Sequence, residues 1–252
     1  MIITPIKTDL VNEGDDLFEI ISKNIKKLSE KSVLAISAKI LSICQGRVVE
    51  KKSTPFEKIK LIKKEADYYL KDAKLKNDII ITNNYNNLTI NAAINECNAN
   101  GKYILLPTDL QNLTNNIWKF VKKYFSIKKV GIIITDSKIL PLKKGSVGTT
   151  LCYCGFKPLF DYKDQGDIFD RKLSLSKINI IESLGASTLL EMGEANEKQP
   201  LCIIQNINKI EFQKHVPNSK ELENIVTTIK GDIFLPVLKN GIWKKGKNKK
   251  YK

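Results

Sequence analysis

Residues 129–137 read KVGIIITDS, and this stretch is the strongest indicator of the fold. Its apolar middle is typical of a strand that is buried on both faces, and Asp136 and Ser137 follow directly. A second stretch of the same kind, SVLAISA, occupies residues 32–38. Two buried strands of this type suit a sheet in the interior of an α/β or α+β protein.

The rest of the sequence predicts further helices and strands by its apolar spacing and turn residues. Helices are expected over residues 15–28, 54–70, 111–125, 174–192 (interrupted at Gly185) and 219–229. Strands are expected over residues 78–82, 88–94, 147–156 and 201–205. Because several strands follow one another without a helix between them, we predict an α/β (α+β) fold with a mixed sheet. Residues 1–240 would form a single domain or two intimately joined lobes. A basic tail over residues 241–252 is expected to fray from about Trp243.

The composition indicates an ordinary cytoplasmic globular protein. The chain has 252 residues, of which 42% are hydrophobic, and no apolar run approaches the length of a membrane span. The N-terminus lacks the basic and long apolar regions of a signal peptide, so the expected address is the cytoplasm. Five cysteines without a CxxC pair, together with one histidine, argue against a zinc site and a disulfide framework.

The formal net charge of +15 has two explanations. Lysine supplies 40 of the 42 basic residues, which favours the compositional drift of an AT-rich genome. A basic protein that binds nucleic acid is the rival interpretation, and it requires a basic face with interleaved aromatic side chains. The lysines are scattered and no recognition motif occurs, so the sequence favours drift.

Residues 241–248, GIWKKGKN, resemble a phosphate-binding P-loop only superficially. Asparagine stands where a Ser or Thr would hold magnesium, and too few residues follow for the helix that a P-loop requires. We therefore exclude nucleotide binding at this segment.

Three polar segments are candidates for a site. Asp136 and Ser137 offer hard oxygen ligands of the kind that Mg²⁺ prefers, although an aspartate that caps a turn would look the same. Residues 91–101 are rich in amides that suit hydrogen bonds to a base or ribose, but taken alone an asparagine-rich turn explains them better. Glu194 follows a predicted helix end at Gly193, where it is either a ligand or a solvated side chain.

Two arginines survive in this lysine-rich chain, Arg47 and Arg171. A guanidinium binds carboxylate or phosphate in a bidentate way that lysine cannot reproduce. A structural ion pair accounts for either arginine equally well, so both alternatives stay open.

These segments occur in an order that resembles the F420-0:γ-glutamyl ligase family. The similar stretches cover about residues 5–210, and no single one is diagnostic. They are EGDDL at 13–17, SAK through GR at 37–47, NAAINECN at 91–98, TDS at 135–137, Asp164 through Asp167 to Arg171, and MGE at 192–194.

A subgroup associated with folate metabolism is more similar still. The stretch NANGKYILLP at residues 98–107 resembles the corresponding segment of those γ-glutamate ligases. PLKKG at 141–145, GFKPL at 155–159 and DY at 161–162 also match that subgroup. The resemblance implies a folate as the glutamate acceptor, with F420-0 as the alternative acceptor.

The resemblance implies the F420-0:γ-glutamyl ligase-like fold, a homodimer and an enzyme that joins L-glutamate to a carboxylate acceptor. It implies a divalent metal, Mg²⁺ or Mn²⁺, and GTP or ATP as co-substrate. The implied metal ligands are Asn95, Asp136, Ser137 and Glu194. The implied nucleotide-binding residues are Pro5, Ile6, Lys7, Ala38, Lys39, Asn98, Met192 and Gly193. The implied catalytic residues are Asp136, Glu194 and Arg171.

Several positions depart from the family pattern. Asn95 replaces a metal-binding aspartate, and Ala93 replaces a glycine. Asp170 also replaces a glycine, and Ile43 stands where many relatives have a lysine that contacts the nucleotide. These departures imply weakened metal binding, a shifted ligand such as Glu96, or a non-catalytic nucleotide-binding relative.

Overall fold

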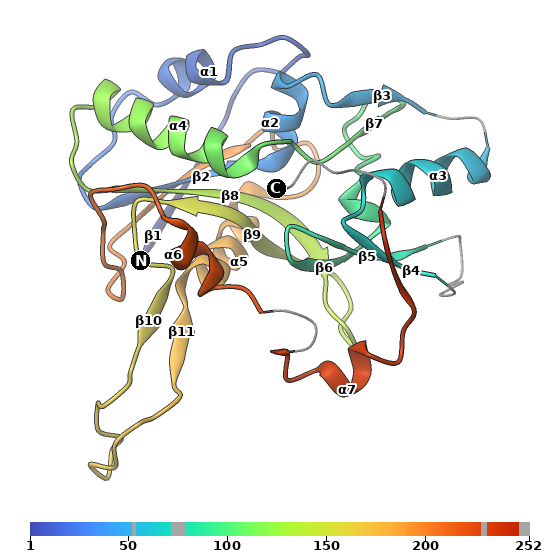
Figure 1. Ribbon diagram of the computed structural model, residues 1–252. Helices are drawn as coiled ribbons and strands as arrows, with labels where there is room; N and C mark the ends of the chain where they lie inside the picture. The colour runs from blue at the N-terminus through green and yellow to red at the C-terminus, as the bar shows by residue number, and fades with distance from the viewer. Residues whose placement is uncertain (52–53, 72–78, 228–230, 247–252) are drawn as a thin grey trace.

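A mixed five-stranded sheet forms the centre of the protein, in the strand order β1-β12-β2-β8-β9 (Figure 1). The computed structural model describes residues 1–51, 54–71, 79–227 and 231–246. β2 and β8 are parallel, and the other neighbouring pairs are antiparallel, which confirms the predicted α+β class with a mixed sheet. The strands are β1 (Ile2–Ile6), β12 (Leu201–Gln205), β2 (Ser32–Ser37), β8 (Val130–Ile139) and β9 (Ser146–Cys154).

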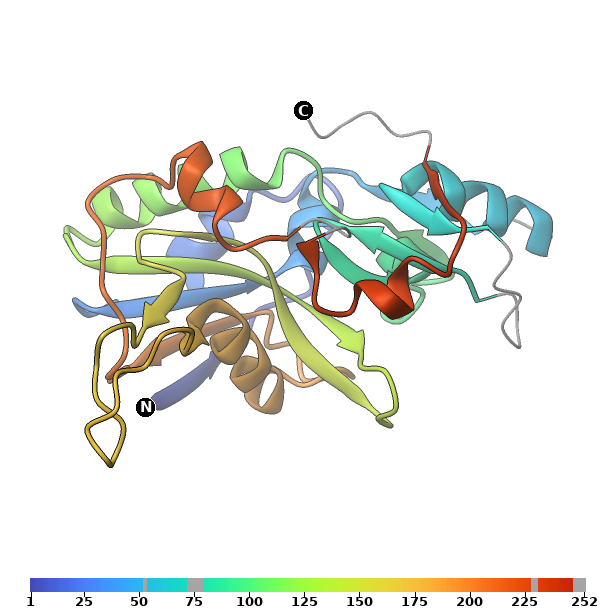
Figure 2. The ribbon, with the colours of Figure 1, turned by 60° about the horizontal axis from the view of Figure 1, so that its bottom comes forward.

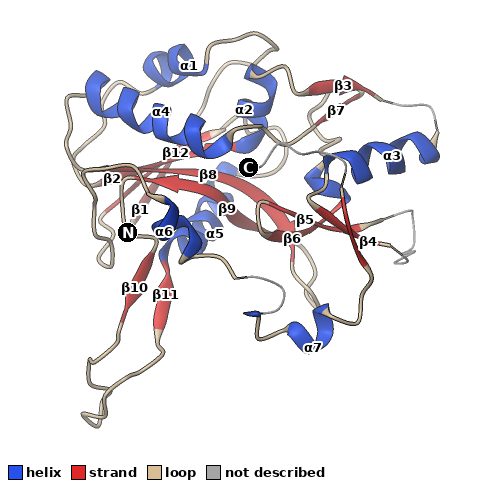
Figure 3. Cartoon of the chain, in the orientation of Figure 1, coloured by secondary structure: helices blue, strands red, loops and turns tan. Residues whose placement is uncertain are grey.

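Helices cover both faces of this sheet (Figure 3). Alternate residues of β2 enter opposite cores: Leu34 and Ile36 pack on one side, and Val33 and Ala35 on the other. This explains why residues 33–36 of β2 and residues 130–134 of β8 carry no polar side chain. The first face carries α1 (Leu17–Asn24), α2 (Ala38–Cys44) and α4 (Leu110–Tyr124), and the second carries α5 (Ile180–Met192).

A smaller sheet lies beside the central one, in the order β13-β4-β5-β6 (Figure 2). The helix α3 (Pro55–Glu65) and the short helix η2 (Asn91–Ala93) share a separate apolar core with it. The strands are β13 (Trp243–Lys245), β4 (Tyr68–Leu70), β5 (Ile81–Asn84) and β6 (Asn87–Ile90). The antiparallel pair β3 (Val48–Glu50) and β7 (Lys102–Ile104) lies next to α2 and α3.

A long hairpin projects from the central sheet on the side opposite α1 and α4 (Figure 1). Its stem is β10 (Leu159–Asp161) paired with β11 (Lys177–Asn179), and we call residues 159–179 the arm. Two short helices follow later in the chain, α6 (Ser219–Glu223) and α7 (Leu235–Leu238). Within the described ranges, no helix is long and apolar enough to cross a membrane.

Two predicted helices differ in extent from the observed ones. α3 begins as expected, with the Thr54 side chain accepting a hydrogen bond from the Glu57 N–H, but it ends at Glu65 because Ala66 is extended. Residues 68–70 pair as a strand instead. α5 begins only at Ile180, since residues 177–179 belong to the arm, and it continues through Gly185 without interruption.

Other boundaries also differ. The predicted helix over 15–28 ends at Asn24, because Ile25 is extended, although Ile25 remains buried. The predicted helix over 219–229 ends at Glu223, and residues 228–229 lie outside the described residues. The predicted strand start at residue 78 also lies outside them. Fraying from Trp243 is wrong for residues 243–245, which pair with β4, and residues 247–252 are not described.

Candidate active site

A cavity of about 730 Å³ lies where the parallel pairing of β2 with β8 ends, at Ser37 and Thr135. Ser37, Asp136 and Ser137 line it there. Its walls include residues from three loops, 8–13, 95–102 and 193–200. Ligands of α/β sheets commonly bind outside the carboxyl ends of parallel strands, at the point where the strand order changes. We therefore take this cavity as the candidate active site.

Asp136 lies in β8 and is paired across the sheet with Thr149 of β9. Burial raises the pKa of Asp136 to about 6. The nearby charge of Glu194 also raises this pKa, whereas the Ser137 backbone N–H and the charge of Lys39 lower it. Asp136 is thus a poorly solvated carboxyl group between a second carboxylate and an ammonium group.

Glu194 reaches the cavity because α5 ends just before it. Gly193 follows the last helical residue with a φ of +74°, a conformation that favours glycine. A Cβ atom at Gly193 would lie 2.3 Å from the carboxyl carbon of Glu197, so a larger residue would displace that side chain. The glycine of the MGE segment therefore permits the sharp turn that carries Glu194 into the cavity wall.

Asn98 joins two walls of the cavity. Its side-chain amide donates a hydrogen bond of 2.7 Å to the Ala195 carbonyl oxygen in the loop that carries Glu194. Thr8 makes a similar connection, because its backbone N–H donates to the Lys198 carbonyl oxygen at 2.9 Å. The loop of residues 193–200 is thus held on both sides.

Asn95 lines the cavity directly after a strained segment. Asn91, Ala92 and Ala93 all have left-handed backbones, with φ values of +52°, +55° and +54°. The Asn95 side-chain nitrogen makes only a long hydrogen bond of 3.4 Å to the Ala93 carbonyl oxygen. Its amide oxygen accepts none from the described residues, so it can serve as a neutral ligand.

Only some of the predicted nucleotide-binding residues line the cavity. Lys39, Asn98, Met192 and Gly193 line the cavity. Ala38 begins α2 and is buried in the core, where its side chain is 2% exposed. Pro5, Ile6 and Lys7 do not line the cavity, whose wall on this side begins at Thr8; the first two lie in β1, paired with β12.

Arg171 is not brought to the cavity of its own chain. It lies in the arm, where its guanidinium carbon is 5.9 Å from the centre of the Phe169 ring. Arg47 has a structural role, because it forms an ion pair with Glu65 and donates a 3.0 Å hydrogen bond to the Leu106 carbonyl oxygen.

Glu96 does not replace the missing aspartate. It forms ion pairs with Lys51 and Lys58, and it does not line the cavity. These two lysines hold the pKa of Glu96 below its usual value. The structure therefore gives the shifted-ligand hypothesis for Glu96 no support.

The comparisons with known proteins identify the family of this chain. The family model described as F420-0:Gamma-glutamyl ligase matches residues 5–206. The chain belongs to this family. A coenzyme F420:L-glutamate ligase of Methanococcus maripaludis strain C7 is 30% identical, over 77% of this chain and 83% of the relative. The enzyme of the same name from Methanopyrus kandleri is 27% identical, over 89% and 93% of the two chains. As a member of the F420-0:γ-glutamyl ligase family, the protein is an enzyme that forms carbon–nitrogen bonds.

The oxygen donors suit a magnesium-like ion only when phosphate supplies the remaining ligands. Among the described residues, no three side chains of His, Cys, Asp or Glu are grouped as a metal site. Asp136 and Glu194 supply two carboxylates, and Ser137 and Asn95 supply neutral oxygens on the same cavity. Mg²⁺ in nucleotide-dependent enzymes often has one or two carboxylates together with phosphate oxygens. The donor set therefore fits a hard cation bound jointly with a nucleotide.

Sequence reasoning missed one feature of the cavity. A Cβ atom at Gly148 would lie 2.1 Å from the Gly185 carbonyl oxygen, so β9 and α5 touch backbone to backbone where they line the cavity. Gly185 was expected to interrupt its helix. Instead, its lack of a side chain allows α5 to approach β9 closely. An isolated glycine in a helix that otherwise has good spacing is the only sequence signal for such a contact.

Proposed function

We propose that this ligase adds L-glutamate to a carboxylate acceptor at the cavity, with consumption of GTP or ATP and dependence on Mg²⁺ or Mn²⁺. The supporting observation is that Asp136, Ser137, Glu194, Asn95 and Lys39 come from separate parts of the chain and line one cavity. Two carboxylates, two neutral oxygens and one ammonium group suit a metal–triphosphate complex.

Each side chain has a distinct part in this proposal. Asp136, Glu194, Ser137 and Asn95 would hold the cation, and Lys39 would neutralise charge on the phosphates. The cation would supply charge neutralisation and alignment of the phosphoryl group. Asn98 would keep the loop of residues 193–200 against the nucleotide, because it already bonds that loop.

The reaction must first activate a carboxylate, which is a poor electrophile. A carboxylate oxygen of the acceptor takes the γ-phosphoryl group, and the bond to the nucleoside diphosphate breaks. The uncharged amine of glutamate then attacks the carbonyl carbon of this acyl phosphate. An amide bond forms, inorganic phosphate leaves, and the amine gives up a proton.

The acceptor is proposed to be a folate, on the strength of the similarity over residues 98–107 and 141–162 to the folate-metabolism subgroup. The second candidate is an F420-0-like acceptor, which the names of the relatives favour. The test incubates purified protein with L-glutamate, GTP or ATP, and Mg²⁺ or Mn²⁺. One arm contains tetrahydrofolate and the other F420-0, and mass spectrometry measures addition of one glutamate. No addition in either arm, at any nucleotide or metal, would contradict the proposal.

The substitution Asn95→Asp tests whether the enzyme has become a non-catalytic nucleotide-binding protein. A carboxylate adds one negative charge at the cation, so we expect tighter metal binding by roughly tenfold. Calorimetric titration of Mn²⁺ with GTP measures this, and Asn100→Asp on the same cavity is the matched control. A wild-type enzyme that ligates at ordinary Mg²⁺ levels and gains nothing from the substitution would refute an impaired site. Tighter binding without any glutamate addition would favour the non-catalytic alternative.

A further inference from the structure

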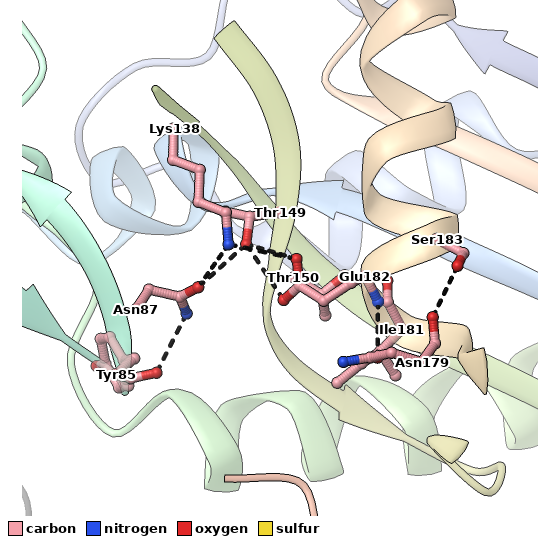
Figure 4. Close-up of polar contacts among 9 residues, drawn as sticks. All are labelled: Tyr85, Asn87, Lys138, Thr149, Thr150, Asn179, Ile181, Glu182 and Ser183. Carbon is pink, nitrogen blue, oxygen red and sulfur yellow. Dashed lines mark hydrogen bonds and ion pairs between the residues drawn. The ribbon is translucent and has the colours of Figure 1, made fainter. Parts of the chain in front are cut away.

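A cluster of four polar side chains connects the small sheet to the central sheet next to the cavity (Figure 4). The Thr149 hydroxyl lies 2.9 Å from one carboxylate oxygen of Glu182 and 3.1 Å from the Asn87 side-chain oxygen. The Lys138 ammonium group donates to that same Asn87 oxygen at 3.2 Å. It also forms an ion pair with Glu182 at 3.5 Å. We call these four residues the polar clamp.

The polar clamp is adjacent to Asp136 in the sheet. Thr149 is the cross-strand partner of Asp136, so their side chains project from the same face. Lys138 follows Asp136 by two residues in the same strand and therefore shares that face too. Thr149 is 2% exposed, which leaves its hydroxyl with protein partners rather than bulk water.

The clamp connects the elements that carry the predicted metal ligands. Asn87 is in β6, and the chain passes from β6 through η2 to Asn95. Lys138 and Asp136 are both in β8. Glu182 lies in the first turn of α5, and Glu194 follows the other end of that helix.

We propose that the polar clamp sets the position of Asn95 and its loop relative to Asp136 and Glu194, so that all of the metal ligands converge. This inference rests on the proposed function. The link between α5 and β9 has independent support, because the Thr150 hydroxyl donates to the Ile181 carbonyl oxygen at 2.6 Å. The clamp is therefore needed for the other connection, between Asn87 of the small sheet and the central sheet.

The charges of the clamp favour a positioning role over an electrostatic one. Lys138 and Glu182 cancel, and Asn87 and Thr149 are neutral, so the cluster adds no net charge beside Asp136. Its loss would change geometry more than local potential. Removal of a group that orients metal ligands typically weakens metal binding by about 10- to 100-fold.

The test compares Thr149→Val, which removes the hydroxyl and keeps the shape, with Thr89→Val in β6. Thr89 is the control because its side chain is outside the clamp and it lies in β6, the strand that carries Asn87. Calorimetry with Mn²⁺ and GTP is expected to show binding weakened about tenfold for Thr149→Val and unchanged for Thr89→Val. Thr149→Ser should restore most of the affinity, because it restores the hydroxyl. In the ligation assay, the metal concentration for half-maximal rate should rise, while the KM for glutamate stays unchanged.

Amide hydrogen exchange provides a readout that does not depend on activity. Thr149→Val should accelerate exchange over residues 87–98 and leave the amides of α5 unchanged. Equal affinities for Thr149→Val and Thr89→Val, or a failure of Thr149→Ser to restore binding, would overturn the proposal. If the wild-type protein binds no metal–nucleotide complex, the proposed function fails. The clamp is then judged on hydrogen exchange alone, and unchanged exchange over residues 87–98 would overturn it.

Discussion

Asp136 is costly to keep ionised where it lies, and that cost supports its proposed role as a metal ligand. A carboxyl group that only capped a turn would be solvated, whereas burial raises the pKa of Asp136 to about 6. Strongly shifted carboxyl groups in a cleft concentrate at functional sites. The Lys39 charge offsets only part of this cost.

The substitution Asp136→Asn should abolish ligation without loss of stability. The amide keeps the shape and removes the desolvated charge, whose cost at neutral pH is at most about 3 kcal/mol for a shift of this size. We expect an unfolding midpoint at pH 7.5 that is equal to or higher than that of the wild type, measured by circular dichroism. A mutant with full ligase activity would show that Asp136 is not a metal ligand.

Metal binding should weaken as the pH falls below about 6. The pKa of Asp136 is raised on folding, so the folded protein favours its protonated form, and the stability cost of the charge disappears as pH falls through 6. A cation needs the ionised form, so its affinity should fall up to about tenfold per pH unit below that point. Titration with Mn²⁺ alone at pH 7.5, 6.5, 5.5 and 5.0 measures this. In the same series, the Mn²⁺ affinity of Asp136→Asn should depend less on pH. An equal pH dependence in both proteins would assign the titration to another group.

The sequence identified several residues that line the cavity, but it did not show which of the candidate residues lie far from it. Asp136, Glu194 and Asn98 follow elements whose ends are readable from apolar spacing and turn residues. Arg171 was selected by residue type, and residue type carries no information on where a long hairpin points. Thr149 was not selected at all, since a threonine in a strand gives no signal until its cross-strand partner is known.

At the scale of elements, η2 stores strain beside the site. Three consecutive non-glycine residues in left-handed conformations are unfavourable by roughly 1–2 kcal/mol each. Ala92 is buried in the small core, whereas Ala93 is only partly buried. The segment keeps this shape because the Thr82 hydroxyl accepts a hydrogen bond from the Ala92 N–H at 2.9 Å, and the Asn91 side chain bonds the Ile80 N–H.

The substitution Ala93→Gly should stabilise the protein by about 0.5–1 kcal/mol. Glycine adopts positive φ without a steric penalty, and this gain exceeds the entropy that glycine loses on folding. Urea denaturation measures the change in the free energy of unfolding. Ala186→Gly in α5 is the control of opposite sign, since glycine inside a helix costs about 1 kcal/mol. Destabilisation by Ala93→Gly would show that packing of the Ala93 methyl group contributes more free energy than relief of the backbone strain gains.

Long apolar strands were the easiest elements to predict, and short paired strands were the hardest. β2, β12 and the first half of β8 carry their own signal because nearly all of their residues there are buried. The three-residue strands β4, β10 and β11 exist only through their partners, which lie elsewhere in the chain. This dependence made the predicted helices over residues 54–70 and 174–192 too long.

At the scale of the whole molecule, exposed apolar side chains on the arm motivate a test of the homodimer that the resemblance implies. Ile168, Phe169 and Leu175 are 91%, 72% and 87% exposed there. Large apolar side chains grouped on a projecting hairpin favour a protein contact over solvent. We expect a dimer in sedimentation velocity, and Phe169→Asp should shift it toward monomer, whereas Phe56→Asp, at an equally exposed site on α3, should not. A wild-type monomer at micromolar concentration would contradict the expectation.

The pairing of β13 with β4 has a consequence for how the protein is made. β4 emerges from the ribosome early, yet the strand that covers its edge follows about 170 residues later. During that interval β4 exposes an uncovered edge that bears Tyr68 and Tyr69, and such edges template aggregation. Nascent chains that stall before residue 243, or products clipped near residue 240, would keep that edge open after the central sheet has closed. Chaperone dependence should therefore persist at the small sheet until residues 243–245 have been synthesised.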